Sequence, residues 1–245
     1  MIIKAFNIVW LLVIALFIGA TIFVTIKFKN KEQITKDKFM TILGISNIVF
    51  FLLYKVWLSI DDYNFVFWKE LPLQLCNINM FLIIIAARSK NKFLTVFSSY
   101  VAPLGAIMAM TFAEPAFTGN SIFLLRNIGF YGTHGIILMM GILLFTLGYQ
   151  KPSFKDIIYL LPALVVISLS AYLVNNLFGL IVNCKTNYFY TCSPAGIGLL
   201  EMFWEWIPLE YLYLLPASVI FIAYICGLNG CILLVKLIKS KIKKA

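Results

Sequence analysis

Long apolar runs, separated by short polar segments, extend along the whole chain. Seven of these runs are near the twenty residues that an α-helix needs to cross the hydrocarbon core of a bilayer. The alternating ten-residue pattern of a membrane β-barrel is not visible, and a helix satisfies its own backbone hydrogen bonds in lipid. The pattern predicts an all-α membrane protein with seven transmembrane helices, at residues 6–26, 39–60, 71–87, 93–112, 122–147, 157–177 and 209–235.

The segment between the sixth and seventh runs is more than a simple connection. Its part 196–208 is apolar but too short to span the bilayer, and it carries Glu201 and Glu205. Such a piece is typical of a helix that lies in the interface or re-enters the membrane. We therefore expect a short interfacial or re-entrant helix before the last span, within a single polytopic membrane domain covering residues 1–245.

The basic residues predict how the chain crosses the membrane. Of the 20 lysines and arginines, 15 lie in four segments that fall on one side of a seven-span protein: 27–38, 88–92, 149–155 and 236–245. Basic loops stay on the cytoplasmic side, so we expect the amino terminus outside, the carboxyl terminus in the cytoplasm and a location in the cell (plasma) membrane. The lysine-rich tail is expected to bind anionic lipid of the inner leaflet.

Composition excludes several other classes of protein. The chain is 62% hydrophobic and only 12% charged, whereas soluble domains are about half apolar and a quarter charged. The net charge of +10 does not indicate nucleic-acid binding, because the charges lie in short loops between the apolar runs. No nucleic-acid partner is expected.

The five cysteines do not form a metal-binding pattern. There is no C-x-x-C pair, and the single histidine does not stand at zinc-ligand spacing from the cysteines, so we expect no metal and no cofactor. Cys184 and Cys192 share one loop, and a disulfide between them stays open, as does the oligomeric state.

The stretch 71–80 is unusual, because it opens an apolar run yet carries a glutamine, a cysteine and two asparagines. Polar side chains in hydrocarbon usually point inward, at a partner or a site. His134, the only histidine, lies inside the fifth run, and we expect it at a similar depth to Cys76 in the outer half of the bilayer. A histidine within reach of a thiol promotes nucleophilic attack on an ester or thioester. The alternative is that Cys76 is an inert apolar residue and His134 bonds a neighbouring carbonyl.

Other polar residues inside the runs are candidates for binding a substrate or supporting the site. Arg126 lies two turns above His134 and could hold a lipid phosphate, or pair with Glu114 or Glu201. The asparagines that end the sixth run could contact the site or cap the helix. The full set is Gln74, Asn77, Asn79, Asn47, Arg126, Asn175 and Asn176.

The run Leu71-Pro72-Leu73-Gln74-Leu75-Cys76-Asn77 resembles the LPLHLCN motif of the YwaF-type family of bacterial integral membrane proteins, with Gln74 where a histidine is common. The resemblance covers about residues 40–235. Further matches follow in order: Phe112-Ala113-Glu114-Pro115, His134-Gly135, Asn187-Tyr188 and Trp204-Glu205-Trp206-Ile207-Pro208.

That family looks related to eukaryotic multi-spanning acyltransferases that place polyunsaturated chains on ether phospholipids with a cysteine and a histidine. The resemblance implies Cys76 as nucleophile and His134 as general base of an intramembrane lipid acyltransferase or acyl hydrolase. Its partners would be phospholipids, or other lipids, that donate and accept the acyl chain.

Two functions without acyl chemistry remain as alternatives. The same polar residues could line the cavity of a small-molecule transport or binding subunit, although the internal repeats of many transporters are missing. They could also hold the helices of a structural partner of other membrane proteins together.

Overall fold

The computed structural model describes the backbone of residues 1–61 and 65–242 and the side chains of 1–60 and 65–234. Over these ranges its regular elements are helices, apart from an isolated bridge between Ile2 and Ser121. The prediction of an all-α protein is confirmed. The long helices are α1 (Ile8–Phe28), α2 (Gln33–Asp61), α4 (Leu75–Ser89), α5 (Lys92–Thr111), α6 (Leu125–Thr146), α7 (Ile157–Ile181) and α9 (Leu215–Ile242).

Shorter helices connect the long ones. α3 (Phe67–Glu70) precedes α4, and α8 (Gly198–Trp206) lies between α7 and α9, where the sequence predicts a short helix. The interfacial or re-entrant position of α8 stays a prediction, as does the orientation of the chain across the membrane. The remaining turns are 3-10 helices: η1 (Pro115–Phe117), η2 (Phe154–Asp156), η3 (Tyr188–Tyr190) and η4 (Leu212–Leu214).

The third predicted span differs most from its helix. Six helices are long and apolar enough to cross a membrane, whereas α4 has 15 residues and covers only about 22 Å. The helix begins at Leu75 rather than Leu71: Pro72 disfavours helical backbone at Leu71, which has ψ 147°, and Gln74 is also extended, with ψ 148°. The segment before α4 is therefore not helical, and Cys76 lies in the first turn of α4.

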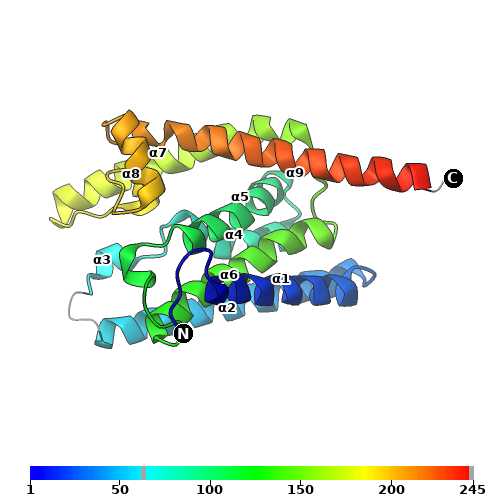
Figure 1. The fold of residues 1–245 in the computed structure, drawn as a ribbon, viewed down its shortest axis with the longest axis horizontal. Coiled ribbons are helices and arrows are strands. Elements are labelled where there is room, and N and C mark those ends of the chain that lie inside the picture. The colour runs from blue at the N-terminus through cyan, green and yellow to red at the C-terminus, as the bar shows by residue number, and fades with distance from the viewer. Residues whose placement is uncertain (62–64, 243–245) are drawn as a thin grey trace.

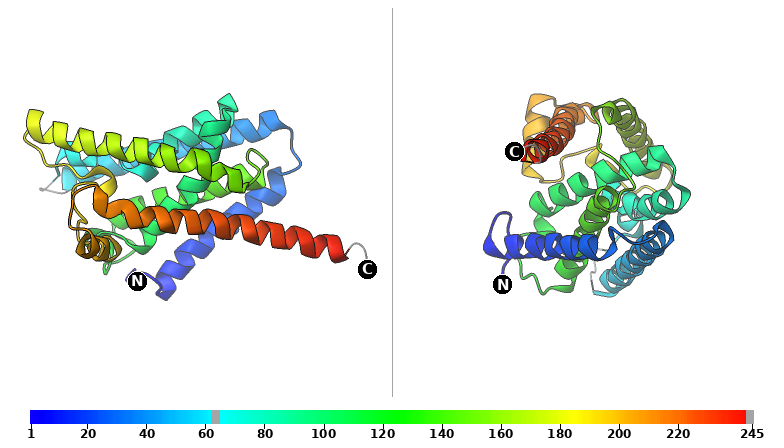
Figure 2. Two further views of the ribbon diagram at one scale, coloured as in Figure 1. Left: turned by 90° about the horizontal axis from the view of Figure 1, so that it is seen from above. Right: turned by 90° about the vertical axis from the view of Figure 1, so that its right-hand side faces the viewer.

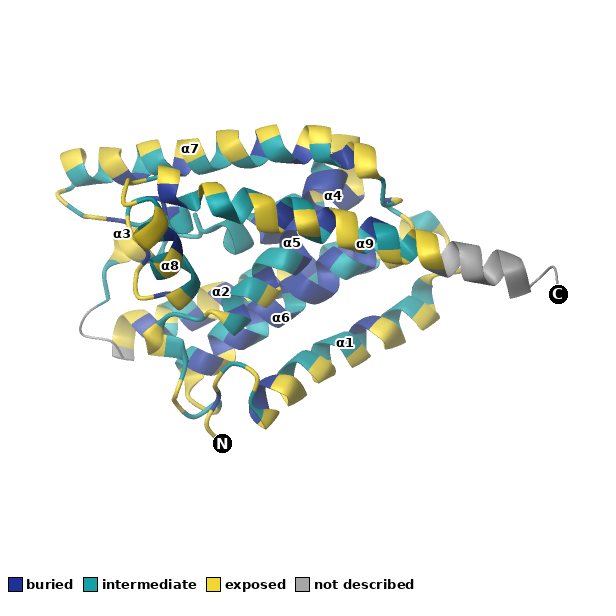
Figure 3. Ribbon diagram, turned by 45° about the horizontal axis from the view of Figure 1, so that its top comes forward, coloured by how far each residue is buried: buried dark blue, intermediate teal, exposed yellow. Residues whose placement is uncertain are grey.

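The helices form layers (Figures 1 and 2). α6 packs against α1, α2, α4 and α5, and one apolar core fills the space between these five helices. α7 and α9 lie on the other side of α5, where a second core joins all three. α5 and α6 are the most buried helices (Figure 3).

The outer helices expose large apolar side chains. Examples are Leu16 of α1, Leu173 of α7 and Val219 of α9, each more than half exposed. Soluble proteins rarely expose apolar surface on this scale, whereas a bilayer covers it. The chain is a membrane protein with multiple apolar helices.

Glycines let aromatic rings lie directly on the backbone of α6. A Cβ at Gly129 would lie 2.1 Å from the ring of Tyr54, and one at Gly135 would lie 2.1 Å from the ring of Phe17. Small residues of this kind allow close helix packing in membranes. Through these two glycines, α2 and α1 pack closely against α6, and the Tyr54 ring is held in place.

A buried carboxylate joins α5, α7 and α9 at one end of the molecule. Asp156 Oδ2 accepts hydrogen bonds from the Tyr100 hydroxyl (3.1 Å), Gln150 Nε2 (3.0 Å) and the Ser153 N–H (3.1 Å). Asn229 of α9 donates to the same tyrosine hydroxyl at 3.2 Å. Buried polar groups are tolerated when they are paired in this way, so the network holds α7 and α9 against α5.

One prediction falls outside the described residues. The side chains of the lysine-rich tail, 236–245, belong to that part of the chain, so its lipid contact stays a prediction. That the chain forms one polytopic domain also stays a prediction.

Candidate functional site

A cavity of about 730 Å³ lies between α2, α4, α5 and α6. Residues 185–200, which connect α7 to α8 and begin α8, form another part of its wall. Ligand pockets in proteins usually have volumes of about 300–1,000 Å³, so the space suits a small molecule or part of a lipid. Cys76 and His134 both line it.

Cys76 lies at the second position of α4, directly after the first helical residue. The N–H groups of a first helical turn have no partner within the helix, and the dipole favours negative charge there. The sulfur lies close to α5, because a Cβ added at Gly105 would be 3.1 Å from it. Gly105, which also lines the cavity, thus leaves room for the thiol.

The hydrogen bond of His134 decides which nitrogen can act as a base. Its Nδ1 lies 2.8 Å from the carbonyl oxygen of Phe130, one turn earlier on α6. A carbonyl oxygen can only accept, so in the neutral ring Nδ1 carries the proton and Nε2 has a free lone pair. The ring also packs on Phe130 with centroids 4.4 Å apart, which fixes its orientation.

Gln74 connects the start of α4 to the loop between α7 and α8, residues 183–197. Its Oε1 accepts from the Phe189 N–H at 2.8 Å, and its Nε2 lies 3.4 Å from the Asn187 oxygen. Gln74, Asn77 and Arg126 line the cavity, as three of the seven supporting candidates.

The α7–α8 loop carries strained backbone where it faces the cavity. Phe189 and Tyr190 have φ of 57° and 55°, a region that non-glycine residues seldom occupy. Tyr190 donates to Glu114 Oε1 at 2.9 Å, and Tyr213 donates to the Tyr190 carbonyl. Burial, and next the charge of Glu114, raise the pKa of Tyr190 above its ordinary value of 10.0, so it remains a donor at neutral pH.

Asn175 holds this loop from α7 and does not line the cavity. Its Nδ2 donates to the Tyr188 carbonyl (3.0 Å) and to Thr191 Oγ1 (2.9 Å). Its Oδ1 accepts from Thr186 Oγ1 (2.8 Å) and the Tyr188 N–H (2.9 Å). Four hydrogen bonds satisfy the amide, so Asn175 shapes the wall through the loop.

The other predicted asparagines lie away from the cavity wall. Asn176 is exposed and donates to the Tyr172 carbonyl at 2.8 Å. Asn79 is buried and donates to the Leu75 carbonyl at 2.9 Å, while the Asn47 amide is buried without a hydrogen-bond partner among the described residues. Of the candidates, the cavity therefore brings together Cys76, His134, Gln74, Asn77 and Arg126.

The chain matches the TMEM164 family model over residues 2–229. It belongs to the TMEM164 family. No curated protein and no solved structure gives a match to the chain. The family is one of transmembrane proteins, which agrees with the helices described above; the relationship to YwaF-type proteins and to lipid acyltransferases stays a prediction.

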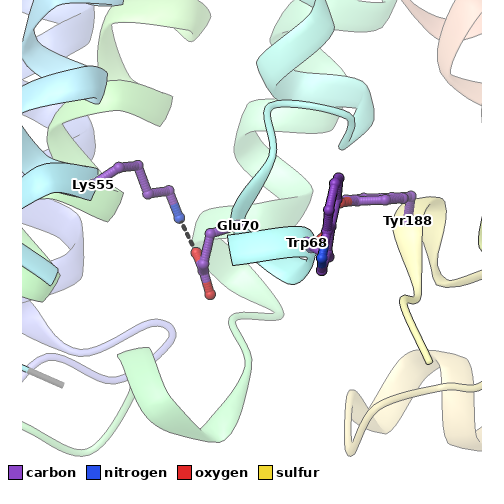
Figure 4. Close-up of polar contacts among 4 residues, drawn as sticks. All are labelled: Lys55, Trp68, Glu70 and Tyr188. Carbon is purple, nitrogen blue, oxygen red and sulfur yellow. Dashed lines mark hydrogen bonds and ion pairs between the residues drawn. The ribbon is translucent and has the colours of Figure 1, made fainter. Parts of the chain in front are cut away.

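In this member of the TMEM164 family, five charged residues besides the predicted Arg126 line the cavity. Lys55 of α2 forms an ion pair with Glu70 of α3 (Figure 4). Tyr188 of the α7–α8 loop donates a hydrogen bond to the carbonyl of Trp68, also on α3. Among the described lining residues, four are basic and two acidic, a formal charge of +2: Lys55, Lys69, Arg126, Lys185, Glu70 and Glu114. The wall therefore favours a ligand with negative charge.

All five cysteines are free thiols. Cys184 and Cys192 lie on the α7–α8 loop, and Cys226 and Cys231 are exposed on α9. The structure thus contains no disulfide between Cys184 and Cys192.

Replacing Gly129 by alanine is expected to destabilise this TMEM164 family member. The new Cβ would lie 2.1–2.6 Å from three ring carbons of Tyr54, and the ring is wedged between α2 and α6. Overpacking of this kind costs about 1–3 kcal/mol, so the thermal midpoint in detergent should fall by several degrees. Gly227→Ala on α9, where nothing lies within 4 Å of the added Cβ, is the matched control and should leave the midpoint unchanged. Equal midpoints for the two variants would contradict the prediction.

Proposed function

We propose that the chain is an intramembrane acyltransferase, or acyl hydrolase, that acts on a lipid through an acyl-enzyme at Cys76. The observation that carries the proposal is that Cys76 and His134 line one cavity, with the hydrogen bond of His134 leaving Nε2 as a free base. The position of Cys76 in the first turn of α4 adds support, because the helix dipole favours the negative charge that develops during attack.

In the acylation step the Cys76 sulfur forms a bond to the ester carbonyl carbon, while its proton moves to His134 Nε2. The π electrons of the carbonyl move onto its oxygen. When they re-form the double bond, the bond to the leaving alcohol breaks, and His134 returns the proton to the alcohol oxygen. An acceptor alcohol or water then gives its proton to His134 and attacks the thioester, which releases the Cys76 thiol.

The cavity wall supports a lipid with an anionic headgroup as substrate. Apolar residues such as Met108 and Phe112 lie beside the basic groups, so one wall suits an acyl chain and a phosphate together. Arg126 would hold the phosphate through paired hydrogen bonds. Such a lipid reaches the cavity from the surrounding bilayer, which we propose to be the plasma membrane, and the lysine-rich tail would add attraction to its anionic inner leaflet.

Binding or transport of an anionic small molecule is the second candidate. The formal charge of +2 on the cavity wall favours it, and it needs no reaction at Cys76. The two functions differ in one measurable product, because only the first forms a covalent acyl thioester.

The test is to treat the purified full chain in detergent micelles with p-nitrophenyl octanoate and to locate the octanoyl group by peptide mass spectrometry. We expect the adduct on Cys76 first, ahead of the exposed Cys226 and Cys231, because the proposed base His134 lines the same cavity as Cys76 and not the surface of α9. Modification of the exposed cysteines without modification of Cys76 would reject acyl chemistry and favour the binding function.

A further inference from the structure

A long part of the chain beside the cavity belongs to neither of the two apolar cores. α7 contributes to the second core only as far as Ile167, and α9 contributes only from Phe221 onward. The residues between them form the segment 168–220, which includes the α7–α8 loop, α8 and η4. Its helix α8 lies at the opposite end of the molecule from the last turns of α9 (Figure 1).

The segment 168–220 is held together by hydrogen bonds of its own. Asn175 of α7 binds the α7–α8 loop through the four bonds described above. The Tyr211 N–H donates to the Thr191 carbonyl at 2.7 Å, and the Tyr172 hydroxyl donates to Glu210 Oε2 at 3.3 Å. These bonds connect the second half of α7, the loop and the residues before α9, so we expect the segment to move as one unit.

Hydrogen bonds also join this segment to the chain on the other side of the cavity. The Phe189 N–H donates to Gln74 Oε1 at 2.8 Å, directly before α4, and the Tyr190 hydroxyl donates to Glu114 Oε1 at 2.9 Å, directly before η1. All four residues line the cavity, so the two bonds connect separate parts of its wall. A contact made of a few hydrogen bonds opens more easily than a buried apolar core.

The other half of α7 is held more firmly. Leu160 of α7 is buried with Phe221 of α9 in the second core, and the Asp156 network ties both helices to α5. Where α7 leaves this core, the Ser168 and Ser170 hydroxyls donate to the Val165 and Val166 carbonyls, at 3.1 and 2.8 Å. Side chains that bond to the backbone of their own helix in this way often bend it. The start of the segment 168–220 is therefore a place where α7 can flex.

We infer that the segment 168–220 swings away from α4 and η1 about this point of α7, and that the bonds of Phe189 and Tyr190 hold it closed. Phe189 and Tyr190 are also the residues with φ of 57° and 55°, and their backbones can relax once the two bonds break. Opening gives a bulky lipid access to Cys76 from the side of the bundle. The motion serves acyl transfer and anion binding alike, so it does not depend on the proposed chemistry.

The first test compares two reagents that share one chemistry and differ in bulk, iodoacetamide and N-(1-pyrenyl)iodoacetamide. Their rates at Cys76 are measured by mass spectrometry on the full chain in detergent micelles. Tyr190→Phe keeps the ring but loses the bond to Glu114, so the pyrenyl reagent should react about fivefold faster, with iodoacetamide within about twofold of wild type. Tyr172→Phe is the matched control, because the bond that it loses lies inside the segment, and both rates should stay unchanged.

The second test is hydrogen exchange, which separates opening of the segment from loosening of the whole chain. In Tyr190→Phe the N–H groups of residues 187–193 should exchange about fivefold faster than in wild type. Those of Phe97 and Tyr100, which are buried in the second core, should exchange at the wild-type rate.

Three results would overturn the inference. Unchanged exchange of residues 187–193 in Tyr190→Phe would exclude the opening, whatever the alkylation rates. Faster exchange in the second core as well would assign Tyr190 to overall stability alone. Faster exchange confined to the segment, with an unchanged rate for the pyrenyl reagent, would exclude access to Cys76 as its role.

The inference and the proposed function fail separately. Neither test uses an acyl group, so a segment that stays closed would leave acyl transfer to be judged by the octanoyl adduct. A chain that opens as expected but is never acylated at Cys76 would reject acyl chemistry and retain the opening.

Discussion

Replacing Cys76 by alanine is expected to abolish acylation of the chain by p-nitrophenyl octanoate and transfer of acyl chains between phospholipids in vesicles. The sulfur is the atom that would carry the acyl group, and no other cysteine lines the cavity among the residues described. Folding should survive, because the side chain is half-buried and its loss removes little more than one methylene equivalent, about 1 kcal/mol. Both activities and the thermal midpoint are measured on the same preparations.

Cys226→Ala is the matched control for this loss. Cys226 is exposed on α9, so its removal should leave the rate of acylation and the thermal midpoint unchanged. If Cys76→Ala retained acyl transfer at the wild-type rate, Cys76 could not be the nucleophile. If both variants lost transfer equally, the loss would not report on the cavity.

The number and order of the helices could be predicted because the bilayer imposes a length on each one. Each predicted span corresponds to one long helix of the structure, and the extra short helix lies where two glutamates interrupt an apolar segment. The start of α4 could not be predicted from hydropathy, since Leu71 and Leu73 continue the apolar run. Pro72 excludes helical backbone at Leu71, and the extended backbone of Gln74 then sets the start at Leu75.

Cys76 and His134 line one cavity, but the sequence provides only an expected depth for each residue and no measure of how each helix is rotated. Asn79 is three residues from Cys76, close to the same face, yet it is buried away from the cavity wall. Whether such a residue reaches a cavity depends on how the neighbouring helix packs. Here Gly105 leaves space beside the sulfur, and sequence periodicity gives no measure of that space.

The α7–α8 loop and Tyr54 show what single-sequence reasoning misses. Phe189 contributes its N–H to Gln74 from more than a hundred residues away, and positive φ at non-glycine residues leaves no signal in the sequence. Tyr54 resembles any aromatic residue of an apolar run. Only the structure shows that this residue lines the cavity and that its hydroxyl is buried without a hydrogen-bond partner among the described residues.

Acylation by the ester and alkylation by iodoacetamide both require the Cys76 sulfur as nucleophile, so loss of Cys76 removes both reactions. A base that takes the thiol proton should affect both reactions, since each needs the sulfur as a nucleophile. Removal of His134, the proposed base, should therefore lower the rates of both acylation and alkylation at Cys76.

Replacing His134 by alanine is expected to slow acylation of Cys76 roughly 10²–10⁴-fold and to slow alkylation by iodoacetamide as well. The variant leaves a space of imidazole size beside the cavity, so free imidazole added to the buffer should restore part of both rates. The lost hydrogen bond to the Phe130 carbonyl costs about 1 kcal/mol of stability. If His134 had only this structural role, added imidazole would not restore the reaction rates. Rates are measured at Cys76 with and without imidazole, and Cys76→Ala, which imidazole cannot restore, is the control. A His134→Ala chain that reacted at the wild-type rate with both reagents would exclude His134 as the base.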